Sequence, residues 1–360
     1  MSKIPILGLI LFSFSISNAQ VRTLDLLFVG DVMGHGGQIK AAEIEPNESY
    51  DYFPCFEFVS NIISEADLAV ANLEVTLPGK PPYQGYPQFR SPDALAEGLH
   101  LAGFDMLTTA NNHSNDARAS GLINTIEVCE RYGFHQTGTF RNAEEKEIRY
   151  PLVVFKNGFK LAFVNYTYGT NGLKTRPPTI VNMIEESAIK SDLSEAIKLQ
   201  PDYIIALMHW GDEYKLIENK KQRVLADSLL HWGADMIIGA HPHVVQPIYQ
   251  VAHKTEQKLI AYSLGNFISS QRKPNTDGGI ILKVRLEKNF QSNDTFLMGH
   301  EYIPVWRHIQ QKKDGKKVYR VLPIQDFQQN DHPNLTLSAT DLSKMNSFAQ
   351  KLTKHLDERR

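Results

Sequence analysis

The sequence predicts an α/β fold in which largely parallel strands alternate with helices. One observation behind this prediction is a set of short apolar runs, such as Leu24–Val29 and Tyr203–Met208, which are typical of strands buried on both faces. The other is helical periodicity between those runs; Ser91-Pro92 opens one such helix and Gly103 closes it. At 360 residues, the chain can form one large domain or two modest ones.

Strands and helices alternate in this way from residue 24 to residue 238. We expect strands at 24–29, 68–71, 104–108, 203–208 and 235–238, and helices at 56–64, 91–103, 121–132, 185–199 and 221–232. Residues 152–155 and 160–165 flank Asn157-Gly158, a dipeptide that favours a hairpin turn.

The pattern changes from about residue 246, where apolar runs follow one another without intervening helices. We expect a hairpin from 247–253 and 258–263, strands at 279–286 and 296–306, and a charged turn at 312–317 between two further strands. Residues 340–356 have the periodicity of an amphipathic helix. The chain therefore ends in a β extension and a terminal helix, and we expect residues 271–360 to complete the same domain as residues 20–270.

The N-terminal residues predict export. Lys3 precedes the apolar stretch Ile4–Ile16, and small residues at 17 and 19 are typical of a signal peptide cleaved after Ala19. The stretch is too short to span a membrane comfortably, but an uncleaved membrane anchor remains the alternative. We therefore expect residues 1–19 to be a signal peptide and the protein to be periplasmic or secreted.

Charge and cysteine content narrow the possible functions only slightly. The net charge of -2 offers no basic excess for nucleic acid, so we expect no nucleic-acid partner. Cys55 and Cys129 are the two cysteines, and in an exported protein they either form a disulfide or remain as buried thiols.

Polar clusters recur at the ends of the predicted strands, and these clusters predict a metal site. The most specific is Gly239-Ala240-His241-Pro242-His243, because two imidazoles one residue apart at a strand end suit metal ligation better than packing. The other four clusters are Gly30-Asp31-Val32-Met33, Ala71-Asn72-Leu73-Glu74, Thr109–Asp116 and Met208–Tyr214, with His209 in the last. In open α/β folds, this carboxyl edge of the sheet is where ligands bind.

Each cluster also has a simpler interpretation. Asp31 could cap a helix or form a turn, His209 could be a hydrogen-bonded core residue, and the segment around His113 could be a plain loop. Taken together, however, they supply mixed oxygen and nitrogen donors that suit Mn, Zn or Fe. The set is large enough for one or two divalent ions, and two ions bridged by a carboxylate would suit hydrolysis.

The order of the motifs resembles that of the CapA or PgsA family, poly-γ-glutamate capsule synthesis proteins whose domain is similar to calcineurin-like metallophosphoesterases. The resemblance covers roughly residues 24–270. The stretches that carry it are Gly30–Met33, Asn72–Glu74, Ala110–His113, Tyr166–Gly172, His209–Tyr214, Gly239–His243 and Tyr262–Phe267. It implies a four-layered α/β/β/α metallophosphoesterase-like sandwich.

The resemblance also implies residue roles. Asp31 would bind the first metal and take part in catalysis, and Glu74 stands where phosphoesterases have a bridging Asp. The second metal would be held by Asn112, His209 and His241, and the first would also be bound by His243. His113 would be the general acid.

One position departs from the phosphoesterase pattern. A His is usual two residues after the first Asp, but here that residue is Met33, a poor ligand for such ions. The first site then lacks one ligand, which water or His35 could replace, or the site could be empty. A single-metal site is therefore an alternative to a dinuclear one.

Residues outside the metal set are candidates for substrate binding. Aromatic, amide and basic groups in one loop suit an amide-linked polymer that bears carboxylates. The substrate-binding set comprises Tyr166, Tyr168, Asn171, Lys174 and Arg176 from this segment, together with Glu213 and Asn266 from the stretches His209–Tyr214 and Tyr262–Phe267. The alternatives are that the loop tyrosines pack on the core and that Asn266 positions a neighbouring loop.

These expectations define a function and its competitors. The resemblance implies an exported, metal-binding protein that acts in synthesis, export or processing of an anionic surface polymer, with metal-dependent hydrolysis as a candidate activity. Membrane-bound capsule synthase components would be further partners. The alternatives are a non-catalytic polymer-binding component of capsule assembly and a periplasmic phosphoesterase.

Overall fold

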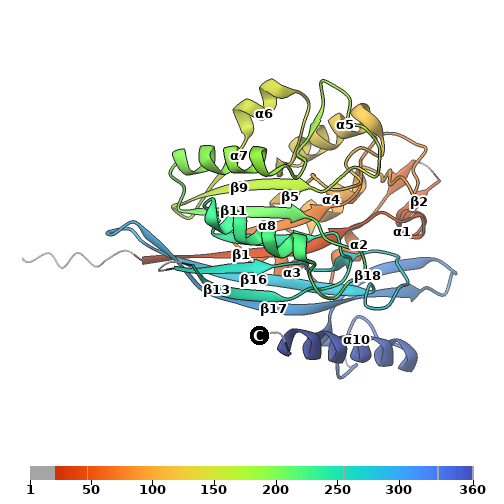
Figure 1. Cartoon of the computed structure of the whole chain (residues 1–360). Coiled ribbons are helices and arrows are strands. Elements are labelled where there is room, and N and C mark those ends of the chain that lie inside the picture. The colour runs from red at the N-terminus through yellow and green to blue at the C-terminus, as the bar shows by residue number, and fades with distance from the viewer. Residues whose placement is uncertain (1–20, 47, 254–255, 331, 359–360) are drawn as a thin grey trace, which may run out of the picture.

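The computed structural model describes residues 21–46, 48–253, 256–330 and 332–358 (Figure 1). The predicted signal peptide lies outside the described residues. No helix within these ranges is long and apolar enough to cross a membrane.

The first of two large sheets contains both the first and the last strand of the fold. Its strand order is β18-β17-β16-β1-β4-β5-β6, with β15 also paired to β1. Strands β4, β5 and β6 run parallel to one another and to β1, whereas β16–β18 are antiparallel to their neighbours. The strands are β1 (Val21–Val32), β4 (Leu68–Leu73), β5 (Met106–Thr108), β6 (His135–Thr137), β15 (Asn266–Ile268), β16 (Gly278–Asn289), β17 (Asp294–Gln311) and β18 (Lys317–Pro323).

The second sheet has the order β13-β14-β12-β11-β9-β8. Its central strands β9, β11, β12 and β14 are parallel, and hairpins close both edges. The strands are β8 (Leu152–Lys156), β9 (Phe159–Thr167), β11 (Tyr203–His209), β12 (Met236–Ala240), β13 (Ile248–His253) and β14 (Glu256–Ala261). Two small two-stranded sheets pair β2 (Glu43–Glu45) with β3 (Ser49–Tyr50) and β7 (Thr139–Phe140) with β10 (Ile180–Val181).

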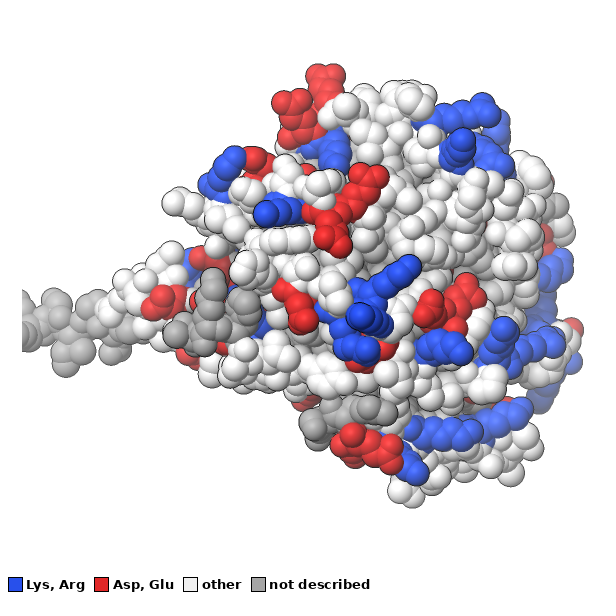
Figure 2. Space-filling model, viewed as in Figure 1, with Lys and Arg blue, Asp and Glu red and all other residues white. Residues whose placement is uncertain are grey.

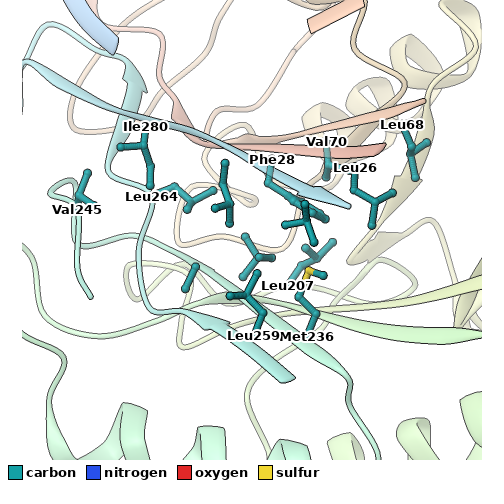
Figure 3. Packing of buried hydrophobic residues seen from close by; sticks show 14 of the residues in the cluster. Leu26, Phe28, Leu68, Val70, Leu207, Met236, Val245, Leu259, Leu264 and Ile280 are labelled. Carbon is teal, nitrogen blue, oxygen red and sulfur yellow. The ribbon is translucent and has the colours of Figure 1, made fainter. Parts of the chain in front are cut away.

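The main core lies between the two large sheets. Figure 3 shows Leu26, Phe28 and Val70 of the first sheet opposite Leu207, Met236 and Leu259 of the second. All six of these side chains are buried. Because both faces of the central strands are covered, these strands read as continuous apolar runs, which is why the sequence predicts them well.

Helices cover the outer face of each sheet, so the fold has the predicted four layers, α/β/β/α. The helices on the first sheet are α2 (Phe53–Phe56), α3 (Ser60–Ser64), α4 (Ala94–Leu101) and α5 (Arg118–Arg131). The second sheet is covered by α7 (Glu186–Lys198) and α8 (Lys220–His231). The predicted fold class is therefore confirmed.

The C-terminal residues extend this architecture. Strand β16 pairs with β1 over most of its length, and β17 and β18 follow outward. Helix α10 (Ala339–Asp357) lies beneath β17 in Figure 1 and buries Met345, Phe348 and Leu352 at the edge of the main core. Strands β16–β18 thus continue the sheet that begins at Val21, and α10 packs on it.

Several local features differ from the sequence-based expectations. The helix expected at 56–64 is two short helices, α2 and α3, with a turn at residues 57–59 between them, and Pro54 lies in the first turn of α2. Helices α1 (Gly36–Ala42), α6 (Ala143–Arg149) and α9 (Ile324–Phe327) were not predicted, because they are short and their sequences are polar or lie within loops. Cys55 and Cys129 are both buried free thiols, so they do not form the disulfide that the sequence left open.

Candidate metal centre

The candidate metal centre lies where the carboxyl ends of parallel strands from both sheets meet. Asp31 is near the end of β1, and Glu74 directly follows β4. From the second sheet, His209 is the last residue of β11, and His241 directly follows β12. The topology therefore brings together side chains that are separated by up to about two hundred residues in the sequence.

Asp31 joins the two sheets through hydrogen bonds to both carboxylate oxygens. The amide of Asn72 donates to Oδ1 over 2.8 Å, and Nδ1 of His243 lies 2.9 Å from Oδ2. The backbone N–H of His241 donates to Oδ1 over 3.3 Å. Burial alone would raise the pKa of Asp31, but the hydrogen bonds and charge of His243 lower it below its ordinary value. The carboxyl group is therefore held as a carboxylate.

Glu74 has the opposite environment. It is completely buried, yet neither oxygen of its carboxyl group has a hydrogen-bond partner. Its nearest basic atoms are Nε2 of His209 at 3.6 Å and Nε2 of His243 at 3.9 Å from Oε1. Burial, followed by the adjacent charge of Asp31, raises the pKa of Glu74 well above its ordinary value. Such an uncompensated buried carboxyl group needs a functional explanation.

His209 and His241 are held as neutral imidazoles. Burial and neighbouring imidazoles lower the pKa of His209 well below its ordinary value and that of His241 to about 3. Nδ1 of His241 is buried without a hydrogen-bond partner. Neutral imidazole is the form that binds metal, because the ring nitrogen then has a free lone pair.

The loop after β12 adopts a rarely populated backbone conformation. His241 and His243 have φ angles of 97° and 60°, which few residues other than glycine adopt. Such conformations persist where the surrounding structure enforces them, and they concentrate at functional sites. The loop directs both imidazoles to the same cluster.

These donors form two overlapping groups suited to a cation. One comprises Glu74, His241 and His243, and the other comprises Asp31, Glu74 and His209; in each group the ligand atoms lie within 4.8 Å of one another. Oδ1 of Asn112 adds a further donor, 2.7 Å from Nε2 of His209. All six residues expected to bind metal are therefore brought together. Glu74 is common to both groups, as expected of a bridging ligand.

The residues fit a divalent metal because some of their buried polar atoms have no hydrogen-bond partner. The unpartnered oxygens of Glu74 and the unpartnered Nδ1 of His241 are atoms that a cation would satisfy. The mixed carboxylate, amide and imidazole set suits Mn, Fe or Zn.

Met33 is buried in the apolar layer under the helices of the first sheet, and it supplies no ligand. Nδ1 of His35 lies 3.2 Å from Oε1 of Gln38 and accepts the backbone N–H of Ser270 over 3.2 Å. His35 belongs to neither ligand group. The substitution at position 33 is therefore not offset by His35 in this structure.

His113 lies beside the metal ligands and is oriented by Asp116. Nδ1 of its ring is 2.7 Å from Oδ2 of Asp116, and both side chains are buried. The ring packs edge-to-face with that of Phe89, with 4.5 Å between ring centroids. Asp116 is fixed in turn by the backbone N–H of Phe89. This arrangement fixes the orientation of the imidazole, as a general acid requires.

Two of the predicted substrate-binding residues border the same cluster. The amide of Asn112 donates to Oδ1 of Asn171 over 3.4 Å. The ring of Tyr168 lies 4.5 Å from that of His241, and 45% of Tyr168 is exposed. Burial raises the pKa of Tyr168 to about 12, so its hydroxyl stays protonated at neutral pH. These side chains form the rim of the centre.

Two other predicted substrate-binding residues, Tyr166 and Asn266, do not join it. Tyr166 is buried beneath α7, where its hydroxyl donates to Asp192, so core packing explains this tyrosine. Asn266 is also buried, and its amide donates to Oε1 of Gln271 and to the carbonyl of Thr276, so it positions a loop. Lys174 and Arg176 are exposed on loops. Glu213 is also exposed, but it lies close enough to Glu74 and Tyr168 for its charge to raise the pKa of both groups.

The sequence did not assign roles to Asn72, Asp116 and Phe89. Asn72 and Asp116 do lie within the polar clusters, and a search for second partners of Asp31 and His113 could have selected them. Phe89 gave no signal, because it lies on an irregular segment 24 residues before His113.

Comparison with solved structures supports the fold. The calcineurin-like phosphoesterase YfkN from Bacillus subtilis superimposes with a TM-score of 0.50 at 13% identity, covering 93% of this chain and 99% of that one. The NAD nucleotidase (NadN) of Haemophilus influenzae gives a TM-score of 0.52 at 12% identity, covering 92% and 63%. At such low identity, these similarities concern the fold alone.

Sequence comparison identifies the family. The capsule biosynthesis protein CapA of Bacillus anthracis is 29% identical over 288 residues, which cover 76% of this chain and 66% of that protein. The PGA biosynthesis protein CapA of Bacillus subtilis strain 168 is 28% identical over 303 residues, covering 79% and 76%. The family model for the bacterial capsule synthesis protein PGA_cap matches residues 25–271. The chain therefore belongs to the bacterial capsule synthesis protein family and has a metallophosphoesterase-like fold.

Proposed function

We propose that this protein is an exported, metal-dependent hydrolase that processes an anionic capsule polymer of the poly-γ-glutamate type. The observation that carries the proposal is Glu74, which lies among Asp31 and three imidazoles. Its carboxyl group is fully buried and has no hydrogen-bond partner. Such a group is destabilising unless a cation occupies the cluster. Export rests on the signal-peptide pattern of residues 1–19.

The proposed ligands are the six clustered residues. Asp31 and His243 would hold one ion, Asn112, His209 and His241 would hold the other, and Glu74 would bridge the two. A divalent ion bound there would supply Lewis acidity toward a phosphoryl or acyl group and activate water for attack. Because Met33 supplies no ligand, the ion site formed by Asp31 and His243 would bind its ion more weakly than the other site.

The protein itself would supply the proton for the leaving group. Asp116 holds Nδ1 of His113, so the proton would be delivered from Nε2 of that ring. The edge-to-face contact with Phe89 limits the motion of the imidazole. Tyr168 and Asn171 would contact the substrate at the rim, and exposed Lys174 and Arg176 would attract its carboxylates.

The assignment of the substrate rests on the family. The related proteins are named for capsule and PGA biosynthesis, and a capsule polymer is therefore the preferred substrate class. Membrane-bound capsule synthase components would be its partners. A second candidate is a polymer-binding assembly component that holds metal without turnover; the loss of a ligand at Met33 is the observation that favours it.

Metal content and hydrolysis, measured on the same preparations, test this proposal. Purified protein incubated with Mn, Zn or Fe and then desalted should retain one or two ions per chain by elemental analysis. His241→Ala should lower this stoichiometry, whereas His231→Ala, an exposed residue at the end of α8, should not. Wild-type protein that retains no divalent ion would contradict the proposal.

Activity separates the two candidate functions. We expect hydrolysis of poly-γ-glutamate or of bis-p-nitrophenyl phosphate by the metal-loaded protein. Since proton transfer typically contributes 10²- to 10⁴-fold, His113→Ala should reduce kcat by at least about 100-fold while leaving metal stoichiometry unchanged. Full metal occupancy without turnover of either substrate would favour the assembly component.

A further inference from the structure

A groove on the surface of the protein lies beside α10 and is open to a ligand. It has a volume of about 780 Å³ and lies between the loop that follows β15, strand β17 and one face of α10. Residues 271–275 line one wall, and Ser343, Ser347 and Phe348 belong to the helical wall. The groove does not include any of the six proposed metal ligands.

The groove is basic, although the chain as a whole is not. The chain has 38 Lys and Arg against 40 Asp and Glu. The groove lining instead has five basic residues and two acidic ones. The basic residues are Arg272, Lys273, Arg307, Lys344 and Lys351, and the acidic ones are Asp277 and Asp341. This local excess of positive charge would attract a polyanion.

The two acidic residues are already engaged within the fold. Asp277 accepts a hydrogen bond from Nε1 of Trp306 over 2.9 Å, and Asp341 accepts one from the hydroxyl of Ser338 over 2.8 Å. Across the part of the chain that the structure describes, no ion pair involves Lys273, Lys344 or Lys351. Their charges are therefore not neutralised by an acidic side chain among the described residues.

The helical wall presents its charges in a regular way. Lys344 and Lys351 are seven residues apart on α10, which places them on the same face of the helix, and both are exposed. Figure 2 shows Lys and Arg side chains gathered over α10 and the segments next to it in this view. A linear ligand that runs along the helix could therefore meet more than one cation.

The opposite wall connects the groove to the metal centre. Asn266, whose backbone pairs with Asp31, holds both ends of the loop through Gln271 and Thr276. From this loop, Nζ of Lys273 lies 4.1 Å from the ring centroid of Tyr214. That ring is 5.9 Å from the ring of His243. A continuous path thus runs from the metal ligand His243 to Lys273 at the edge of the groove.

We propose that this groove binds the flanking part of a linear polycarboxylate while one unit of the same polymer occupies the metal centre. The inference rests on the proposed function and assigns a binding site to it. Lys273 holds the carboxylate next to the centre, and Lys344 and Lys351 hold carboxylates farther along the chain. The groove consequently favours polymers over short substrates.

Charge reversal on α10 tests this inference. The double variant Lys344→Glu/Lys351→Glu, far in sequence from every metal ligand, should bind end-labelled poly-γ-glutamate at least roughly tenfold more weakly in fluorescence anisotropy at low salt. The loss should shrink as ionic strength rises. The matched control, Lys190→Glu/Lys198→Glu, reverses two exposed lysines on α7 and should bind as the wild type does.

The remaining measurements distinguish failure of this inference from failure of the proposed function. Metal stoichiometry and hydrolysis of bis-p-nitrophenyl phosphate should be unchanged in both double variants. Equal polymer affinity in the α10 and α7 variants, with wild-type binding intact, would overturn the groove alone. Wild-type protein that holds metal but does not bind the polymer would overturn both the groove and the polymer substrate. Stronger binding of polyphosphate than of poly-γ-glutamate would overturn the assignment to a polycarboxylate.

Discussion

The two edges of the parallel strands both carry carboxylates but use them differently. At the amino edge, an Asp immediately precedes each of four parallel strands. Each of these residues accepts a backbone N–H from the neighbouring strand through its side chain and donates its own N–H to the carbonyl of the same neighbour. The pairs are Asp67 with Asp25, Asp105 with Ala69, Asp202 with Lys160, and Asp235 with Ile204.

Two of these amino-edge carboxylates also have a buried cation. Asp202 pairs with Nζ of Lys288 over 2.7 Å, and both side chains are less than 10% exposed. Asp235 pairs with Lys258, which is buried to a similar extent. Each carboxylate therefore has both a backbone donor and a cation supplied by the chain itself.

The carboxyl edge lacks such partners for its buried carboxyl group. Glu74 has neither a backbone donor nor a lysine, and the imidazoles of His209 and His241 in the same cluster have pKa values lowered by burial. The difference indicates that the amino edge contributes to stability and that the carboxyl edge is prepared for a cation from outside. Changes at the two edges should therefore alter stability in opposite directions.

The largest effect is expected at the amino edge. Asp202→Ala would leave the ammonium group of Lys288 buried without a partner, and breaking such a pair costs about 3–5 kcal/mol. Denaturant unfolding should show a loss of this size, while metal stoichiometry should stay at the wild-type value.

A second variant checks the cause of that loss. Asp202→Ala/Lys288→Met removes both charges, and it should recover a large part of the lost stability because no orphaned charge remains. If the double variant were as unstable as the single one, the carboxylate would contribute mainly through the backbone N–H of Lys160.

The sequence predicted the core of the fold because burial on two faces leaves an unambiguous pattern. The continuous apolar runs before Asp31 and His209 mark strands covered on both sides. By contrast, β7 and β10 are two residues long and depend on pairing across about forty residues, which no local pattern reveals. The interruption at residues 57–59 was missed because the apolar periodicity continues through it.

The candidate site was predictable in its ligands but not in its supporting contacts. His241 and His243 were recognisable because the polar pattern interrupts the end of a buried strand. Tyr166 gave a misleading signal, because its motif resembles a functional loop while its ring packs beneath α7. The amino-edge aspartates, one residue before each strand, were visible in the sequence, but their pairing depends on strand order.

At the carboxyl edge, Glu74→Gln should stabilise the metal-free protein. Burial raises the pKa of Glu74 in the folded state, so the folded protein binds more protons than the unfolded chain and loses stability as pH rises from about 4.5 through the folded-state pKa. A tenfold difference between the proton affinities of the folded and unfolded states corresponds to about 1.4 kcal/mol, so a gain of at least about 1 kcal/mol is expected at pH 7.

The pH dependence provides the check for this prediction. With chelator present, unfolding free energies of Glu74→Gln and wild type should converge near pH 4 and separate by pH 7. Added metal should then raise the Tm of the wild type more than that of the variant, because the variant lacks the bridging carboxylate. Equal stability of the two proteins at pH 7 would mean that Glu74 is not destabilising in the absence of metal.

The smallest effect is expected for Asp105→Ala, which tests whether the buried cations account for the strength of the amino edge. Asp105 accepts the backbone N–H of Ala69 over 2.8 Å, as Asp202 does for Lys160, but no lysine or arginine pairs with it among the described residues. Loss of one such hydrogen bond costs about 1 kcal/mol. Denaturant unfolding should therefore show a clearly smaller loss than for Asp202→Ala. If the two losses were equal, the hydrogen bonds from backbone N–H groups would account for most of the stability at the amino edge. Glu74 would then differ from the amino-edge aspartates because it lacks a backbone donor, and not because it lacks a cation.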